Sequence, residues 1–308
     1  MKDFLNIADL SPAQAAWLID RAISDKAAFR AGKLPATLAR KTLAMIFEKP
    51  SLRTRVSFET AMTHLGGHAI YLTQSDIGMG KREAIQDVAR VLARMCDGIM
   101  ARTFGHQLVA DLARHATVPV INALTDYSHP CQAMADLMTA KEHFGDLHGR
   151  TMAFIGDGNN VSRSLAVACG KLGMNFVLSC PPGYELEKTF VQSLEGQQIG
   201  SHYAVVNDPA AAVKSADVLY TDTWVSMGRE AEKEKRVKAF TGYQINRALM
   251  QQAPKHAIVM HCLPAYRDFE ITDEIFEAQA KTILDEAENR LHFQRTLLDV
   301  LMAQGGIK

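Results

Sequence analysis

The chain has 308 residues, more than one hydrophobic core usually organises, so we expect two domains. Hydrophobic residues make up 47% and charged residues 22% of the sequence, which is ordinary for a soluble globular protein. The 34 basic side chains balance the 34 acidic ones, and this zero net charge gives no electrostatic reason to expect nucleic acid as a partner.

The sequence carries no sign of export or of membrane insertion. Its start has acidic residues early and no long apolar core, so we expect no signal peptide. No run approaches the ~18 consecutive apolar residues of a membrane-spanning helix. The five cysteines are odd in number and include no Cys-x-x-Cys pair, which argues against a disulfide framework and a structural zinc site. We therefore expect a cytoplasmic protein with reduced thiols.

Short runs rich in valine, isoleucine and leucine alternate with helical segments almost from end to end. The runs are apolar on both faces, as strands are when both sides of a parallel sheet are buried. The expected strands are residues 43–47, 69–72, 98–101, 118–123, 151–155, 176–179, 203–206, 218–221, 258–261 and 282–284.

The segments between these runs carry helix boundaries. Ser11 is a suitable N-cap before Pro12 at the first helical position, and the pair Gly66 and Gly67 ends the helix that follows Phe58. The alternation predicts the α/β class, with two domains that each contain a parallel sheet covered by helices on both faces.

A short polar segment, residues 144–149, separates a helix from a new strand and contains two glycines. We place the domain boundary there, with residues 1–146 in the first domain and 147–288 in the second. Residues 289–303 form a strongly amphipathic helix, which could return to the first domain or cap the second. The residues alone leave both positions open.

Residues 47–55 join an expected strand to a helix. Ser51 is a good N-cap, so the unpaired N–H groups that follow it lie at the positive end of the helix dipole. Arg53 adds a planar fork of donors that suits phosphate oxygens. The segment predicts a phosphate site, although a capped surface helix fits it equally well. It lacks the glycines of a nucleotide-binding P-loop.

Two further groups of the first domain stand near strand ends. Arg102 follows the strand 98–101, at the sheet edge where open α/β folds bind ligands. His129 and Gln132 flank Pro130 at a helix start, and both side chains could donate to a carbonyl oxygen. Taken alone, Arg102 also fits a surface arginine and His129 a structural histidine.

Residues 154–161 open the second domain with a pattern close to a dinucleotide-binding loop. Val161 stands where the third glycine of Gly-x-Gly-x-x-Gly belongs, and the next strand ends in Ser-Cys-Pro-Pro instead of an acid that could bind a ribose. We therefore reject a nicotinamide cofactor. Asn159 and Asn160 instead offer amides at a helix start, which suits a ligand carboxylate.

Two later strand ends of the second domain carry polar groups. Asp222 follows the strand 218–221 and could hold an ammonium group or cap a turn. The strand 258–261 runs into Cys262 and Leu263, which places the thiol and a backbone carbonyl at a strand end. Residues 229–236 mix both charges, and we expect them to form a solvated face or a mobile loop.

Together these motifs resemble the aspartate/ornithine carbamoyltransferase family over essentially the whole chain. The family's Ser-x-Arg-Thr-Arg motif matches residues 51–55, and its His-Pro-x-Gln motif matches residues 129–132. Residues 222–228, 261–264 and 285–292 resemble the ornithine branch. The resemblance implies transfer of the carbamoyl group of carbamoyl phosphate to the δ-amine of L-ornithine, which gives citrulline and phosphate in arginine metabolism.

The resemblance also implies a set of site residues. The expected contacts of carbamoyl phosphate are Ser51, Leu52, Arg53, Thr54, Arg102, His129, Pro130, Cys131, Gln132, Cys262, Leu263 and Arg290. The expected contacts of ornithine are Asn160, Asp222, Ser226 and Met227. The groups expected to carry the catalytic step are Arg53, Arg102, His129, Asp222 and Cys262.

In the family the C-terminal helix returns to the first domain, and the resemblance implies the same here. It also implies a homotrimer or a multiple of trimers, and a reaction with no metal or organic cofactor. Two positions depart from the family pattern. Leu52 stands where threonine is frequent, and Gly78 stands where a glutamine often reaches carbamoyl phosphate. Lys81 and Arg82 are the candidates to compensate for Gly78.

Other functions fit parts of this pattern. A carbamoyltransferase could instead act on N-acetylornithine, putrescine or aspartate. Asp222 and the Ser-Met-Gly segment after it favour a free α-amino acid with an amine side chain, whereas aspartate would call for cations in the second domain. A binding protein of the same fold would not need the polar groups that the site motifs contain.

Overall fold

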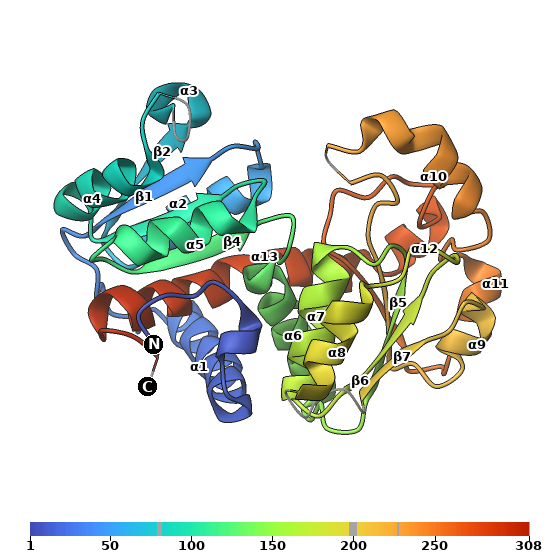
Figure 1. Cartoon of the computed structure of the whole chain (residues 1–308). Helices are drawn as coiled ribbons and strands as arrows, with labels where there is room; N and C mark the ends of the chain where they lie inside the picture. The colour runs from blue at the N-terminus through green and yellow to red at the C-terminus, as the bar shows by residue number, and fades with distance from the viewer. Residues whose placement is uncertain (79–81, 197–201, 227, 308) are drawn as a thin grey trace. The chain divides into compact units, whose positions relative to one another are not determined.

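The computed structural model describes residues 1–78, 82–196, 202–226 and 228–307, and the chain divides into two compact units (Figure 1). The first unit comprises Met1–Met138 and Glu288–Lys308, and the second comprises Thr139–Ala287. This division falls within the helix α6 (Pro130–Phe144), whereas we expected the boundary after residue 146. Each unit is described by itself below.

The first unit contains a four-stranded parallel sheet in the order β2-β1-β3-β4. Its strands are β1 (Thr42–Phe47), β2 (His68–Thr73), β3 (Gly98–Arg102) and β4 (Val120–Leu124). Its helices, besides α6, are η1 (Ile7–Asp9), α1 (Pro12–Arg30), α2 (Leu52–His64), α3 (Gln74–Ile77), α4 (Ile85–Met95) and α5 (His106–His115).

Both faces of this sheet are buried. On one face, Ala44 of β1 belongs to a hydrophobic cluster with Val88 of α4 and Leu112 of α5. Leu43 and Met45, the neighbours of Ala44 along β1, are fully buried as well. Consecutive side chains of a strand point to opposite faces, so the second face of the sheet is also covered. Burial on both faces explains why the strand is apolar without alternation.

The second unit contains a five-stranded parallel sheet in the order β7-β6-β5-β8-β9. Its strands are β5 (Thr151–Ile155), β6 (Asn175–Ser179), β7 (Tyr203–Val205), β8 (Val218–Thr221) and β9 (Ile258–His261). Its helices are α7 (Asn160–Lys171), α8 (Lys188–Gly196), α9 (Pro209–Val213), η3 (Glu230–Glu232), α10 (Lys233–Ala239), α11 (Arg247–Met250) and α12 (Asp273–Ala278).

Helices cover both faces of the second sheet too. Ile155 of β5 packs in one hydrophobic cluster with Val213 of α9 and Phe276 of α12. On the opposite face of the same strand, the sulfur of Met152 lies 4.0 Å from that of Cys169 in α7. The α/β architecture predicted from the alternating pattern is therefore confirmed in each unit.

The helix α13 (Ala280–Leu298), followed by the segment η4 (Asp299–Ala303), packs against the first unit from Glu288 onward. The Lys26 ammonium donates to Asn289 Oδ1 at 2.7 Å, and the Phe4 and Phe293 rings lie 6.2 Å apart between centroids. Of the two positions that the residues left open, the return to the first domain is confirmed.

The expected strand at residues 282–284 is wrong, because these residues lie in α13. Ile283 is fully buried while its neighbour Leu284 is 57% exposed, and Glu286 and Arg290 are buried further on. This spacing of three and four residues is helical. The buried stripe of α13 contains polar side chains, so a search for apolar periodicity could not recognise it.

The remaining expected strands are present, with ends that differ by at most two residues. Ser11 caps α1 in a capping box with Gln14, and α2 ends at His64, just before the glycine pair. These features depend on local sequence, which explains why they could be predicted.

The stability of the first unit should depend on pH through His292 of α13. Burial lowers the pKa of this histidine to about 4, whereas the pKa of histidine in an unfolded chain is about 6.5. Between these values the unfolded chain binds more protons than the folded one, so stability is lost as pH falls from about 6.5 toward 4. We expect the thermal unfolding midpoint to drop between pH 7 and pH 5, measured by circular dichroism.

The variant His292→Gln should reduce this dependence on pH, because glutamine does not titrate. His143→Gln, at an exposed position of α6, serves as the matched control and should leave the slope unchanged. An unaltered slope in His292→Gln would contradict the assignment.

Candidate functional site

The residues expected to bind phosphate lie at the carboxyl edge of the first sheet. In the strand order β2-β1-β3-β4, the chain passes from β1 to β2 on one side and from β2 back to β3 on the other side. The strand order therefore reverses next to β1. Such a reversal of strand order opens a crevice at the carboxyl ends of the strands. Arg102 ends β3, and its carbonyl accepts a hydrogen bond at 2.9 Å from the N–H of Glu48, the residue after β1.

Ser51 caps the helix α2, as expected. Its hydroxyl accepts from the Thr54 N–H at 3.3 Å and donates to the Thr54 hydroxyl at 3.2 Å. The N–H groups of the first turn, including that of Arg53, stand at the helix end that carries partial positive charge. A phosphate group could therefore bind there through backbone N–H groups.

His129 and Gln132 lie at the start of α6 and are both buried, as is Arg102. Burial lowers the pKa of His129 well below the usual value for histidine, and the charges of Arg290 and Arg102 lower it further. The imidazole is therefore neutral at physiological pH. A neutral imidazole can donate one hydrogen bond to a carbonyl oxygen.

Pro130 and Cys131 follow His129 in the first turn of α6. The Cys131 thiol is buried and donates to the backbone carbonyl of Asn122 at 3.5 Å. Burial raises the pKa of this thiol to about 12. The side chain of Cys131 is therefore a protonated packing group, so the backbone is the part of this residue that could contact a ligand.

Hydrogen bonds connect Arg290 of α13 to two expected ligands of carbamoyl phosphate. Its guanidinium donates through Nη1 to Gln132 Oε1, and through Nη2 to Thr54 Oγ1 at 3.3 Å. Gln132 in turn donates through Nε2 to Asp136 Oδ1 at 2.7 Å. The structure thus brings together α2, α6 and α13, three segments that are far apart in the sequence.

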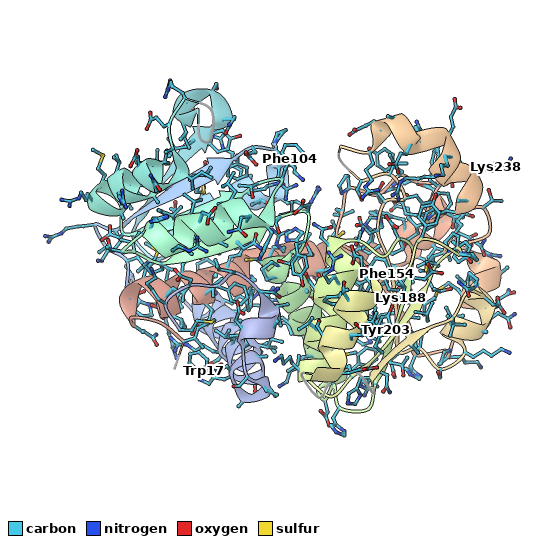
Figure 2. All side chains as sticks on the ribbon, in the orientation of Figure 1. Trp17, Phe104, Phe154, Lys188, Tyr203 and Lys238 are labelled. Atoms are coloured by element: carbon cyan, nitrogen blue, oxygen red, sulfur yellow. The ribbon has the colours of Figure 1, made fainter. Side chains whose placement is uncertain are left out.

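Lys49 belongs to the same part of the first unit, and we did not expect it there. Its side chain is buried, and its ammonium lies 4.1 Å from the centroid of the Phe104 ring, which is labelled in Figure 2. Burial lowers the pKa of Lys49, and the charge of Arg102 lowers it further. The only signal in the sequence was its position two residues before the cap Ser51.

Lys49, Arg53, Arg102 and Arg290 form what we call the cationic cluster. All four charges act on His129, and all four lower its pKa. A cluster of cations next to a helix N-terminus favours a ligand with multiple negative charges. The first unit is therefore equipped to bind a phosphate group together with a carbonyl group.

Asp222 lies at the corresponding reversal of strand order in the second sheet, between β5 and β8. Its carboxylate accepts from Asn159 Nδ2 at 2.9 Å and from the Cys262 thiol at 3.2 Å. It also accepts from the Thr223 N–H at 2.7 Å. Three uncharged donors thus fix the direction of a buried carboxylate, which suits contact with an amine.

The two asparagines at the start of α7 differ in what they do. Asn159 is the N-cap of the helix, and its Oδ1 accepts from the Ser162 N–H at 3.0 Å while its Nδ2 holds Asp222. The sequence predicts a ligand-binding amide at Asn159, whereas in the structure this amide positions Asp222. Asn160 is the first helical residue and is partly buried, as is Ser226, whereas Met227 lies outside the described residues.

Cys262 and Leu263 follow β9 in a turn that buried polar groups hold in place. Leu263 has φ +58°, in the left-handed region. His261 Nδ1 accepts from the Leu263 N–H at 2.9 Å, so the proton is on Nε2, which lies 3.0 Å from Glu270 Oε1. No sequence pattern indicated Glu270, nine positions after His261. This turn directs the Cys262 thiol to Asp222.

Our expectation for residues 229–236 is wrong at one position. Most of this run is exposed, but Arg236 is only 3% exposed. Its guanidinium pairs with Asp157 at 2.7 Å and with Glu232 at 2.8 Å, and it donates to the Trp224 carbonyl at 3.2 Å. A sequence pattern of mixed charges does not show which arginine pairs with an acidic residue of a distant loop.

Comparisons with known proteins match both units. The model of the aspartate/ornithine carbamoyltransferase carbamoyl-P binding domain matches residues 2–142, and that of the Asp/Orn binding domain matches residues 148–301. The chain belongs to the aspartate/ornithine carbamoyltransferase family.

Relatives in this family cover the chain from end to end. The chain is 47% identical over 309 residues to the ornithine carbamoyltransferase of Pyrococcus horikoshii, which covers 100% of this chain and 97% of that protein. Among solved structures, the ornithine carbamoyltransferase from Pyrococcus furiosus has a TM-score of 0.93 at 46% identity, covering 100% of this chain and 98% of that one. The anabolic enzyme from Campylobacter jejuni has a TM-score of 0.92 at 39% identity, covering 99% and 100%.

Leu52 and Gly78 depart from the pattern of the carbamoyltransferase family. The Leu52 side chain is 75% exposed, so its position in the first turn of α2 contributes a backbone N–H and little side-chain packing. Gly78 ends α3 with φ +65°. The Arg82 guanidinium donates to the carbonyls of Asp76 and Ile77 at 2.9 and 3.1 Å, whereas Lys81 lies outside the described residues. Compensation for Gly78 by either side chain stays a prediction.

Gly158 has a structural cause in this member of the carbamoyltransferase family. A Cβ atom at Gly158 would lie 2.5 Å from the carbonyl carbon of Glu185. A side chain at position 158 would therefore collide with the backbone of another loop. In a dinucleotide-binding loop the corresponding glycine lets the backbone approach the pyrophosphate instead.

Within the described part of the chain, no group of three or more histidine, cysteine, aspartate or glutamate side chains could hold a metal ion. No helix in the described ranges is long and apolar enough to cross a membrane. None of the five cysteines is in a disulfide in the structure.

The high pKa of two buried thiols predicts low reactivity. Burial raises the pKa of Cys131 and of Cys180 to about 12, so only a minute fraction of either is thiolate at pH 8. We expect iodoacetamide at pH 8 to modify both at least about a hundredfold more slowly in the folded protein than after unfolding in urea. Peptide mass spectrometry over time measures the two rates. Rapid modification of either thiol in the folded protein would contradict its burial.

Proposed function

We propose that this chain is an ornithine carbamoyltransferase, which transfers the carbamoyl group of carbamoyl phosphate to the δ-amine of L-ornithine and forms L-citrulline and phosphate. The observation that carries the proposal is the Asp222 carboxylate, held by Asn159 and Cys262 at the strand-order reversal of the second sheet. A carboxylate in that position favours an amine substrate. The cationic cluster of the first unit has the opposite charge, which suits a phosphate.

In this proposal carbamoyl phosphate binds through the first turn of α2 and the cationic cluster. The N–H groups and hydroxyls of Ser51 and Thr54, together with Arg53, hold the phosphate. His129 and Gln132 contact the carbamoyl group, with the backbone of Pro130 and Cys131 beside them. The remaining proposed contacts are Leu52, Arg102, Cys262, Leu263 and Arg290.

L-Ornithine is proposed to bind through the second unit. Its α-carboxylate contacts Asn160 and Met227, and its α-amine contacts Asp222 and Ser226. We assign the binding of carbamoyl phosphate to residues 1–146 together with the helix from about residue 289, and the binding of ornithine to residues 147–288.

The reaction is nucleophilic attack of the neutral δ-amine on the carbamoyl carbon. A carbon–nitrogen bond forms, the bond from the carbamoyl carbon to the phosphate oxygen breaks, and the amine loses one proton. Arg53, Arg102 and neutral His129 stabilise the negative charge that develops on the carbamoyl oxygen and on the leaving phosphate. Asp222 and Cys262 form a relay for the proton, with phosphate as its final acceptor. This chemistry requires no metal and no organic cofactor.

We further propose that the chain forms a homotrimer or a multiple of trimers and acts in the cytoplasm. The support for the trimer is membership of the family, and the support for the cytoplasm is the five cysteines, none of which is in a disulfide.

The test of the proposed function is an assay with four amines. The purified protein is incubated with carbamoyl phosphate and with L-ornithine, N-acetylornithine, putrescine or L-aspartate, and the ureido product and phosphate are both measured. Product with L-ornithine alone is the expected result. Product with a different amine would overturn the ornithine assignment and keep that of carbamoyl phosphate, whereas no product with any amine would overturn the proposed enzyme.

Replacement of Arg53 should abolish most of the activity. Arg53→Ala removes the guanidinium proposed to hold the phosphate, and we expect kcat/KM to fall by about a thousandfold or more while the protein folds normally. Arg114→Ala, an exposed arginine of α5, is the control and should retain full activity. A loss of less than about tenfold in Arg53→Ala, equal to ~1.4 kcal/mol of transition-state stabilisation, would sink the assignment.

Activity should rise with pH through the neutral range. The δ-amine of free ornithine resembles a lysine side chain, with a pKa of roughly 10, so its reactive neutral form becomes more abundant as pH rises. The pKa of His129 is lowered well below its usual value by burial and nearby cations, so His129 stays neutral across this range. His129→Asn should therefore lower kcat but keep its rise between pH 6 and pH 8, measured at saturating substrate. A flat profile in the variant would assign the titration to His129.

A further inference from the structure

Asp136 is a buried carboxylate next to the proposed carbamoyl phosphate site, and the mechanism above gives it no part. It lies on α6 one turn after Gln132 and is fully buried. Its Oδ1 accepts a hydrogen bond at 2.7 Å from Gln132 Nε2. Burial of an acidic side chain is costly unless its contacts are well formed, so this contact needs an explanation.

The contact fixes the orientation of the Gln132 amide. A carboxylate offers acceptors only, so the amide must turn its NH₂ group toward Asp136 and its oxygen away from it. Gln132 Oε1 then accepts from Nη1 of Arg290. A reversed amide would place its NH₂ group against the N–H groups of Arg290, donor against donor. Asp136 thereby determines which end of the amide meets the arginine.

A second glutamine also turns its amide oxygen toward Arg290. Gln294 satisfies its hydrogen bonds only with its oxygen toward Arg290, where it accepts from Nε at 3.1 Å and from Nη2 at 3.0 Å. Its NH₂ group then donates to the Ser57 hydroxyl at 2.5 Å. Both amides orient the guanidinium through neutral oxygens, and Thr54 adds a hydroxyl.

We propose that Asp136 is a positioning residue for carbamoyl phosphate, which acts by fixing the amide of Gln132 so that Gln132 and Arg290 are set for the carbamoyl group. The inference rests on the proposed function and assigns Asp136 no contact with substrate. The amide of Gln132 transmits the orientation from Asp136 to Arg290 through its two hydrogen bonds.

If Asp136 positions Gln132, its removal should weaken the binding of carbamoyl phosphate. If Asp136 acted only through its charge, its removal should strengthen that binding. A negative charge near the cationic cluster opposes the binding of an anion, so its removal alone would tighten the binding of any phosphate ligand. Loss of the fixed amide would instead weaken the ligand that carries a carbamoyl group. Inorganic phosphate lacks that group and therefore reports only the electrostatic part.

The experiment compares the two ligands in Asp136→Asn, which keeps the shape of the side chain. Asparagine has both an oxygen and an NH₂ group, so the Gln132 amide can adopt either orientation. With saturating ornithine, we expect the KM of carbamoyl phosphate to rise at least about tenfold, equal to ~1.4 kcal/mol if KM reports binding. We expect the inhibition constant of inorganic phosphate to stay unchanged or to fall.

Two controls test whether Asp136 acts through Gln132. The helix α5 carries the same arrangement on its exposed surface, where Gln107 Nε2 donates to Asp111 Oδ1 at 3.0 Å. Asp111→Asn should change neither constant. In a Gln132→Ala background, Asp136→Asn should raise the KM of carbamoyl phosphate by less than about twofold, because two residues that act as a unit are not additive.

Two outcomes in a folded Asp136→Asn variant would overturn the proposal: a KM within about twofold of the unmutated value, or equal changes in both constants. A full tenfold effect in the Gln132→Ala background would overturn it as well. If Asp136→Asn does not fold, Asp136→Ser removes the charge without adding bulk and is judged by the same comparison. Failure of the unmutated chain to form citrulline would instead overturn the proposed function, so the two failures are distinguishable.

Discussion

The buried positive charge of the first unit is the constraint on which the rest of the site depends. Lys49, Arg102 and Arg290 are each less than a tenth exposed, and together with Arg53 they lower the pKa of His129. Burial of a cation costs several kcal/mol unless partners offset it. At the contacts described for Arg290 these partners are amides and a hydroxyl, which orient the guanidinium. A cluster of cations in this position favours an anionic ligand.

The second unit applies the same principle with the opposite sign. Asp222 is a buried carboxylate that neutral donors hold in place: an amide, a thiol and a backbone N–H. In both units the charged group stands at the carboxyl edge of a parallel sheet where the strand order reverses. Carbamoyl transfer needs this combination, because one substrate is a dianionic acyl phosphate and the other presents amines. Uncharged hydrogen-bond partners fix the orientation of these charged side chains before a ligand binds.

The sequence predicted features that depend on neighbouring residues and missed those that depend on distant ones. Strands, the Ser51 cap and the glycine pair after α2 follow from local periodicity and capping preferences. The strand expected at residues 282–284 was wrong because the buried stripe of α13 contains glutamate and arginine. Arg236 was expected on a solvated face and Lys49 was not singled out, because burial of a charge is set by segments that the chain brings from elsewhere. Most assigned roles therefore came from family resemblance, and the structure added the contacts between them.

The two glutamine–aspartate pairs on α5 and α6 show why spacing alone does not assign a role. Gln107 and Asp111 have the same separation as Gln132 and Asp136, and both pairs form the same side-chain hydrogen bond. On the exposed surface such a pair contributes a few tenths of a kcal/mol, because water competes for each group. In the interior water cannot replace either partner, so the orientation of the amide becomes fixed. The effect of this fixed orientation depends on α13, which places Arg290 next to the amide oxygen of Gln132, although the two residues are 158 positions apart.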